Sequence, residues 1–201
     1  MPRKHMLLIA VGFEGALVLL GWGLGEVFGT PAFGSLRLTG AALGYGVLAC
    51  VPMLLGLAWV ARSRWTPLAR FRHTMDKDVA PLFAHCTALD LVLISALAGL
   101  GEEVLFRGFM QTALDGVMGL WPALVITSIV FGLAHFVTVT YAVYATLIGV
   151  YLGALLILSD NLLVPILAHA VYDFVALIYL IYVRLPAIGL DSGSELPPSS
   201  E

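Results

Sequence analysis

A long stretch of the sequence, from Gly116 to Ser159, contains no aspartate, glutamate, lysine or arginine. A bilayer core of ~30 Å needs about 20 apolar residues in one helix, so this stretch is too long for one span and suits two. We expect the break near Val137–Tyr141, where β-branched residues are poor helix formers. Charged residues make up only 11% of the whole chain, against about 25% in soluble domains. The chain therefore needs a membrane around it.

Four further segments have the length and composition of membrane spans. They are Met6–Phe28, Gly40–Ala61, Phe83–Met110 and Leu162–Val183. The pattern predicts an all-α, polytopic transmembrane helical bundle of about six spans, forming a single integral-membrane domain over residues 1–184. Residues 185–201 are rich in proline, serine and acid, and we expect them to form a disordered C-terminal tail. The first span is too long for the apolar core of a cleavable signal peptide.

The basic residues predict how the chain is oriented in the membrane. Five of them lie between the second and third spans, at Arg62, Arg64, Arg70, Arg72 and Lys77. Lysine and arginine concentrate in cytoplasmic loops, so we expect a multi-pass protein of the cell membrane with both termini in the cytoplasm. Thr66–Met75 within this loop has helical spacing, which fits either a short helix on the membrane surface or a solvated loop. The net charge of -3 gives no basic footprint for nucleic acid.

Charged residues inside the third predicted span point to a polar interior. An ionisable residue within a span is costly and usually faces a polar partner. Glu103 and Arg107 are four residues apart, so they share one helix face and can pair. Glu102 is turned away from that face by about 100°. One carboxylate is thus held by a cation while the other is free for proton chemistry, although an ordinary ion pair at a helix end has the same pattern.

Two later helices add further polar groups. His135 lies in an apolar helix, and His169 and Asp173 form another pair four residues apart in the last span. Each group also has a purely structural explanation. His135 fits a hydrogen-bonded packing residue, and His169 and Asp173 fit a pair that hydrogen-bond only to each other. Together they favour one shared cluster around water, a substrate or a metal, because separate burial would leave each polar group unsatisfied. Glu14 in the first span fits either a helix–helix hydrogen bond or a carboxylate that supports such a cluster.

These residues form three motifs that resemble those of the CPBP family, the CAAX protease and bacteriocin-processing group of intramembrane proteases. They are Glu102, Glu103 and Arg107 in the first motif, Phe131 and His135 in the second, and His169 and Asp173 in the third. The resemblance covers about residues 89–182. It implies a helical CAAX-protease-like core whose active site lies inside the membrane.

The resemblance also implies roles for the motif residues. Glu102 resembles the base that activates water, and His135 the residue that helps to position that water. Glu103 and Arg107 resemble a supporting pair, and His169 with Asp173 resembles the pair that stabilises the oxyanion. The last position is often asparagine in the family, and an ionised Asp173 cannot donate a hydrogen bond to an oxyanion. Asp173 must therefore carry a proton, orient His169 or act as a metal partner.

We therefore expect an intramembrane endopeptidase that hydrolyses a peptide bond of a membrane-protein or peptide substrate with glutamate-activated water. This mechanism requires no cofactor. Glu102, His135 and His169 would also form a ligand set compatible with zinc, as in a metalloprotease. Two other classes remain open: a non-catalytic immunity or scaffold protein on the same fold, and a small transporter or proton relay.

Overall fold

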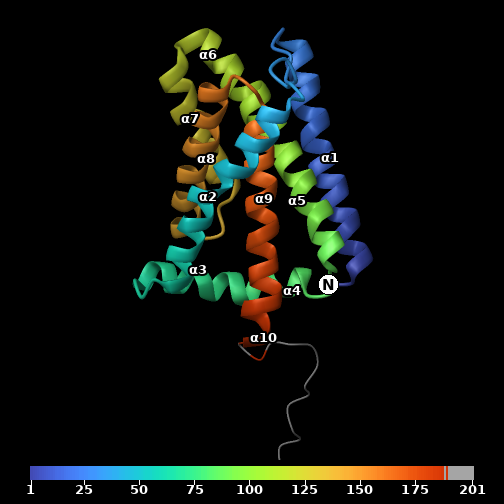
Figure 1. Cartoon of the computed structure of the whole chain (residues 1–201), viewed down its shortest axis with the longest axis vertical. Coiled ribbons are helices and arrows are strands. Elements are labelled where there is room, and N and C mark those ends of the chain that lie inside the picture. Colours follow the sequence, from blue (N-terminus) through green and yellow to red (C-terminus); the bar gives the residue numbers. More distant parts are fainter. Residues whose placement is uncertain (188, 190–201) are drawn as a thin grey trace, which may run out of the picture.

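A computed structural model describes residues 1–187 and 189, and within that part of the chain every regular element is a helix (Figure 1). Four helices are long and apolar enough to cross a membrane: α1 (Arg3–Val27), α2 (Gly40–Arg62), α8 (Val139–Ser159) and the continuous helix Leu163–Arg184. The last of these comprises α9 (Leu163–Ile178) and the π-helical turn η3 (Tyr179–Arg184). Large apolar side chains such as Leu8, Leu48 and Leu147 are exposed on their outer faces, as a lipid environment requires.

The remaining two predicted spans differ from full-length straight helices. The third is a continuous helix of α5 (Ala88–Glu103), the π-helix η2 (Val104–Gln111) and α6 (Thr112–Met118). The fourth, α7 (Leu120–Ala134), is shorter than a span. The break between α7 and α8 falls at residues 135–138, close to its expected place. The prediction of a helical membrane bundle with about six spans is therefore confirmed, with α7 as a short sixth member.

The expected start of the third span at Phe83 was too early. The chain bends by 110° between the segment Thr66–Phe83 and the helix that begins at Ala88. Thr87 accepts a hydrogen bond from the backbone N–H of Asp90, and the Asp90 carboxylate accepts one from the backbone N–H of Thr87. This reciprocal capping box fixes the start of α5. Asp90 also pairs with Arg3, so it ties α5 to the start of α1 rather than entering the membrane interior.

The basic loop folds into α3 (Thr66–Thr74), the π-helical turn η1 (Met75–Val79) and α4 (Ala80–Phe83), which lie across the lower end of the bundle in Figure 1. The chain's N-terminus and α10 (Leu185–Ala187) lie at the same end. The apolar side of α3, with Leu68 and Phe71, packs against Val60 of α2 and tyrosines of α8. Of the two alternatives left open for this loop, the structure has a helix, and its apolar face contacts protein.

The helix of the last span continues past residue 184, the expected end of the membrane domain. Leu185 is buried against Ala80 and Ile181, so α10 continues the packing of the last span. The expected domain boundary itself stays a prediction. Apart from residue 189, the rest of the predicted C-terminal tail lies outside the described residues.

Helix α5 lies between α1 and α9, and two glycines allow this close packing. A Cβ atom on Gly99 would lie 2.8 Å from the backbone oxygen of Ile166 in α9. A Cβ atom on Gly101 would lie 2.7 Å from the backbone oxygen of Glu14 in α1. Small residues at helix interfaces let backbones approach closely in membranes. The two glycines therefore bring α5 close to α1 and α9 immediately before Glu102 and Glu103.

Replacing Gly99 with alanine should destabilise the protein, because the new methyl group would force α5 and α9 apart. Overpacking of this kind costs about 1–3 kcal/mol. Thermal unfolding of the detergent-purified protein measures the effect. Gly12→Ala in α1 is the matched control, because a Cβ atom on Gly12 would have no neighbour within 4 Å. Equal melting temperatures for the two variants would contradict the close contact between α5 and α9.

Candidate active site

The structure brings the six predicted site residues into one cluster from three separate helical segments, with His135 and Asp173 partly exposed and the other four buried. Glu102 and Glu103 end α5, and Arg107 follows in η2. His135 lies directly after the last residue of α7. His169 and Asp173 lie one turn apart in α9. The end of α5 thus faces both the end of α7 and the middle of α9.

Glu103 and Arg107 form a fully buried ion pair at the base of this cluster. Both side chains are 0% exposed, and Arg107 Nη1 donates to Glu103 Oε1 at 2.8 Å. Arg107 Nη2 donates to the backbone oxygen of Gly149 in α8 at 3.0 Å, and the guanidinium lies 4.4 Å from the ring centre of Phe131 in α7. Arginine suits this position because its planar group can stack and donate in several directions at once. The pair thus ties η2 to α7 and α8.

Glu103 also fixes the position of His169. The same oxygen, Oε1, lies 2.8 Å from Nδ1 of His169. Because Glu103 is already paired with Arg107 as a carboxylate, it is the acceptor and Nδ1 carries the hydrogen. Nε2 of His169 consequently points toward Glu102 and Asp173, at 3.9 Å from Glu102 Oε2 and 3.4 Å from Asp173 Oδ2. The sequence did not predict this contact between the first and third motifs.

His135 faces Glu102 with a defined ring nitrogen. Its Nδ1 lies 2.8 Å from the backbone oxygen of Phe131, which can only accept, so Nδ1 is the donor. In the neutral ring Nε2 is then an acceptor, and it lies 3.4 Å from Glu102 Oε2. Within the described residues, no side chain or backbone group donates a hydrogen bond to this glutamate oxygen. Two acceptors therefore face each other across a gap that a donor with two hydrogens, such as water, can bridge.

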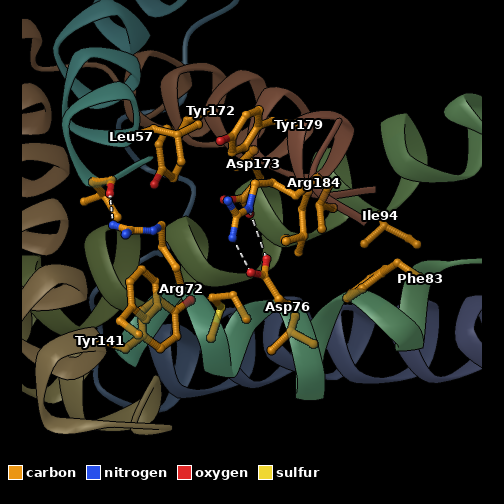
Figure 2. A pocket seen from close by; sticks show the side chains of 18 of the residues that line it. Leu57, Arg72, Asp76, Phe83, Ile94, Tyr141, Tyr172, Asp173, Tyr179 and Arg184 are labelled. Atoms are coloured by element: carbon orange, nitrogen blue, oxygen red, sulfur yellow. Dashed lines mark hydrogen bonds and ion pairs between the residues drawn. The ribbon is translucent and has the colours of Figure 1, made fainter. Parts of the chain in front are cut away.

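A cavity of about 380 Å³ reaches this cluster from the end of the bundle that carries the basic loop. Its lining includes Asp173, Tyr172 and Tyr141 near the cluster, and the ion pair of Asp76 with Arg184 farther away (Figure 2). Most of the other lining residues are apolar. The cavity therefore extends from the loop end of the bundle to Asp173, while the other five site residues are not among its lining residues.

Comparison with known proteins supports the expected resemblance. Residues 84–175, which include all six site residues, match the family model described as type II CAAX prenyl endopeptidase Rce1-like. Over this segment the chain is therefore similar to CAAX-protease-like membrane proteins. A relative, the uncharacterized protein YpbD of Bacillus subtilis (strain 168), is 29% identical over 136 residues. The match covers 65% of each chain, slightly less than two thirds of the relative's length, and no solved structure matches.

The CAAX-protease-like site does not present a ready metal-binding group. Among residues 1–187 and 189, no three histidine, cysteine, aspartate or glutamate side chains are arranged to hold a metal ion. Glu102, His135 and His169 approach one another, and hydrogen bonds at Nδ1 of both histidines direct their Nε2 atoms toward Glu102 Oε2, at 3.4 and 3.9 Å. The zinc ligand set considered from the sequence stays a prediction.

Sequence reasoning missed several contributors to the CAAX-protease-like site. Phe131 supplies both the carbonyl that orients His135 and the ring that stacks on Arg107. The backbone oxygen of Gly149 receives the second arginine hydrogen bond. A π-helix begins directly after Glu103, and such segments are frequent at functional sites. Only Phe131 carried a sequence signal, because it opens the second motif.

Arg107→Ala should strongly destabilise the protein, because it leaves the Glu103 carboxylate buried without its cation. Breaking a buried pair in this way costs about 3–5 kcal/mol. Arg107→Lys should lose less stability than Arg107→Ala, because lysine keeps the positive charge although it loses the stacked contact with Phe131. The control is Arg37→Ala, which breaks an exposed pair with Asp160 worth about 0–1 kcal/mol. Thermal unfolding in detergent measures all three, and a melting temperature for Arg107→Ala equal to that of the control would refute the supporting role.

Proposed function

We propose that the chain is an intramembrane endopeptidase in which Glu102 activates water for attack on a peptide bond. The observation that carries this proposal is the 3.4 Å separation of Glu102 Oε2 and His135 Nε2. Both are acceptors, so one water molecule beside them could donate a hydrogen bond to each. Such a water would lie beside the Glu102 carboxylate. No arginine or lysine of the described residues pairs with Glu102, so this carboxylate can accept a proton.

The proposed reaction needs no group beyond these side chains and water. Glu102 takes a proton from water while the water oxygen bonds to the peptide carbonyl carbon. The carbonyl oxygen becomes an oxyanion. When the tetrahedral intermediate collapses, the C–N bond breaks and Glu102 returns its proton to the leaving nitrogen. The products are a carboxyl group and an amine, and the glutamate regains its starting form.

His169 and Asp173 together provide the oxyanion donor in this proposal. Nδ1 of His169 donates to Glu103, so Nε2 and the Asp173 carboxylate can approach to 3.4 Å favourably only if one of them carries a further proton. That proton gives the pair a donor to offer the developing oxyanion. With this shared proton, an aspartate at position 173 can take the role of the asparagine that is frequent in the family.

The substrate in this proposal is a membrane protein or peptide that enters through the cavity from the loop end of the bundle. The last turn of α2 with Arg62, the loop with four further basic residues between α2 and α5, the N-terminus and α10 all lie at that end. Because basic loops face the cytoplasm, we propose that both termini of the chain and the opening of the cavity lie on the cytoplasmic side of the cell membrane.

Glu102→Gln should abolish processing without unfolding the protein, because glutamine is similar in size but cannot take a proton from water. Quantitative analysis of new protein termini in membranes from wild-type and variant cells tests this. The expected result is that substrate precursors accumulate and their processed termini disappear. Glu26→Gln, at an exposed carboxylate near the end of α1, is the control.

Unchanged termini in the Glu102→Gln cells would contradict the hydrolase and favour a non-catalytic scaffold. Proton flux into proteoliposomes without any proteolysis would favour a transporter. Elemental analysis of the purified protein addresses the cofactor, and stoichiometric zinc required for activity would overturn the metal-free mechanism.

Asp173→Asn should retain most activity, whereas Asp173→Ala should lose it. The asparagine amide can donate one hydrogen to Nε2 of His169 and offer the other to the oxyanion. Alanine offers neither, and loss of one oxyanion donor costs about 10²–10³ in rate. The rate of processing of a substrate found in the previous experiment measures this. An inactive asparagine variant would show that the carboxyl group itself is needed.

A further inference from the structure

A carboxylate that the proposed reaction does not use lies beside the site. Glu14 is in the middle of α1, and its side chain faces inward with the residue only 9% exposed. Its Oε2 is buried and receives no hydrogen bond from any described residue. A buried, unpaired polar group in a membrane span is costly, so it calls for a functional explanation.

The backbone packing places Glu14 next to the end of α5. Its Oε2 lies 3.0 Å from the position that a Cβ atom on Gly101 would occupy, and Gly101 directly precedes Glu102. Glu14 also lines the same cavity as Asp173 of the site. Among the described residues, no lysine or arginine donates a hydrogen bond to Oε2 of Glu14. Glu14 is therefore part of the same polar cluster, and its partner is not a basic side chain of the described residues.

Glu14 and Asp173 both line the cavity that leads to the cluster, from the two helices that pack against α5. Several other polar lining groups already have partners: the hydroxyls of Tyr144 and Tyr172 lie 3.0 Å apart, and Asp76 is paired with Arg184. A peptide in such an apolar cavity cannot leave its backbone N–H groups without acceptors. Glu14 offers an unused acceptor where a substrate would pass on its way to Glu102.

We propose that Glu14 is a substrate-binding residue whose carboxyl oxygen accepts a hydrogen bond from a backbone N–H of an extended peptide next to the scissile bond. The proposal rests on the proposed hydrolase function and adds a fourth helix, α1, to the site. Gly101 allows this role, because any side chain there would occupy the space of the Glu14 carboxyl group.

The test compares Glu14→Leu, Glu14→Gln, Glu102→Gln and the control Glu26→Gln in cells that express equal amounts of protein. The readout is the processing rate, by isotope pulse-chase, of those membrane proteins whose processed termini depend on the wild-type chain. Leucine keeps the approximate size of Glu14 but not the acceptor, so processing should fall about tenfold, as expected for the loss of one ordinary hydrogen bond. Glutamine keeps a carbonyl acceptor, so its processing rate should stay within about twofold of wild type.

Thermal unfolding of the same purified variants separates this role from a structural one. Replacing an unpaired buried polar group by an apolar one of similar size is neutral or stabilising. The melting temperature of Glu14→Leu should therefore equal or exceed that of wild type while its processing falls. A lower melting temperature, or failure of both Glu14→Leu and Glu14→Met to accumulate in the membrane, would show a structural role and overturn the proposal.

The remaining outcomes are also decisive. Wild-type processing by Glu14→Leu, together with none by Glu102→Gln, would overturn the substrate contact while leaving the hydrolase intact. Loss of processing in both Glu14→Leu and Glu14→Gln would show that the charge is needed, which also overturns a backbone acceptor. Unchanged processing in Glu102→Gln would instead defeat the hydrolase proposal itself.

Discussion

One carboxylate oxygen organises the interior of this protein. Oε1 of Glu103 accepts hydrogen bonds from both Arg107 and His169, each at 2.8 Å, and Arg107 reaches on to α8 and to the ring of Phe131. A single buried anion therefore connects α5, η2, α7, α8 and α9. Because both charges are fully buried, removing either would leave the other without compensation. The arrangement of the polar cluster depends on this pair remaining intact.

The same pair explains how two adjacent glutamates can differ chemically. Glu103 lies on the helix face that meets Arg107 and His169, so its negative charge is balanced. Glu102 lies about 100° around the helix, where its nearest partners are the Nε2 atoms of two histidines. Hydrogen bonds at the opposite sides of both imidazole rings hold these nitrogens toward Glu102. Neighbouring positions on one helix thus acquire different surroundings, a balanced ion pair for Glu103 and two imidazole nitrogens for Glu102.

Much of this could be predicted from sequence because it depends on local spacing. The contact between Glu103 and Arg107, and that between His169 and Asp173, follow from helical geometry over four residues. The start of α5 also has a local signal, the capping pair of Thr87 and Asp90. The prediction from hydropathy began the span at Phe83, because hydropathy alone does not show where a helix bends. The bond from His169 to Glu103 depends on how α9 is rotated against α5. Such a rotation is set by packing at residues like Gly99, which no local pattern reveals.

The position of Glu14 shows why an intramembrane polar residue is easier to detect than to explain. Its charge in an apolar span is visible in the sequence, but Gly101 of α5 beside it and Asp173 of α9 in the same cavity lie far along the chain. The packing of α1 across Gly101 brings it beside Glu102, and its buried oxygen has no partner among the described residues. A helix that served only to anchor the bundle would be more stable with leucine at this position. The presence of a carboxyl group there is therefore better explained by a ligand that enters the cavity than by the fold itself.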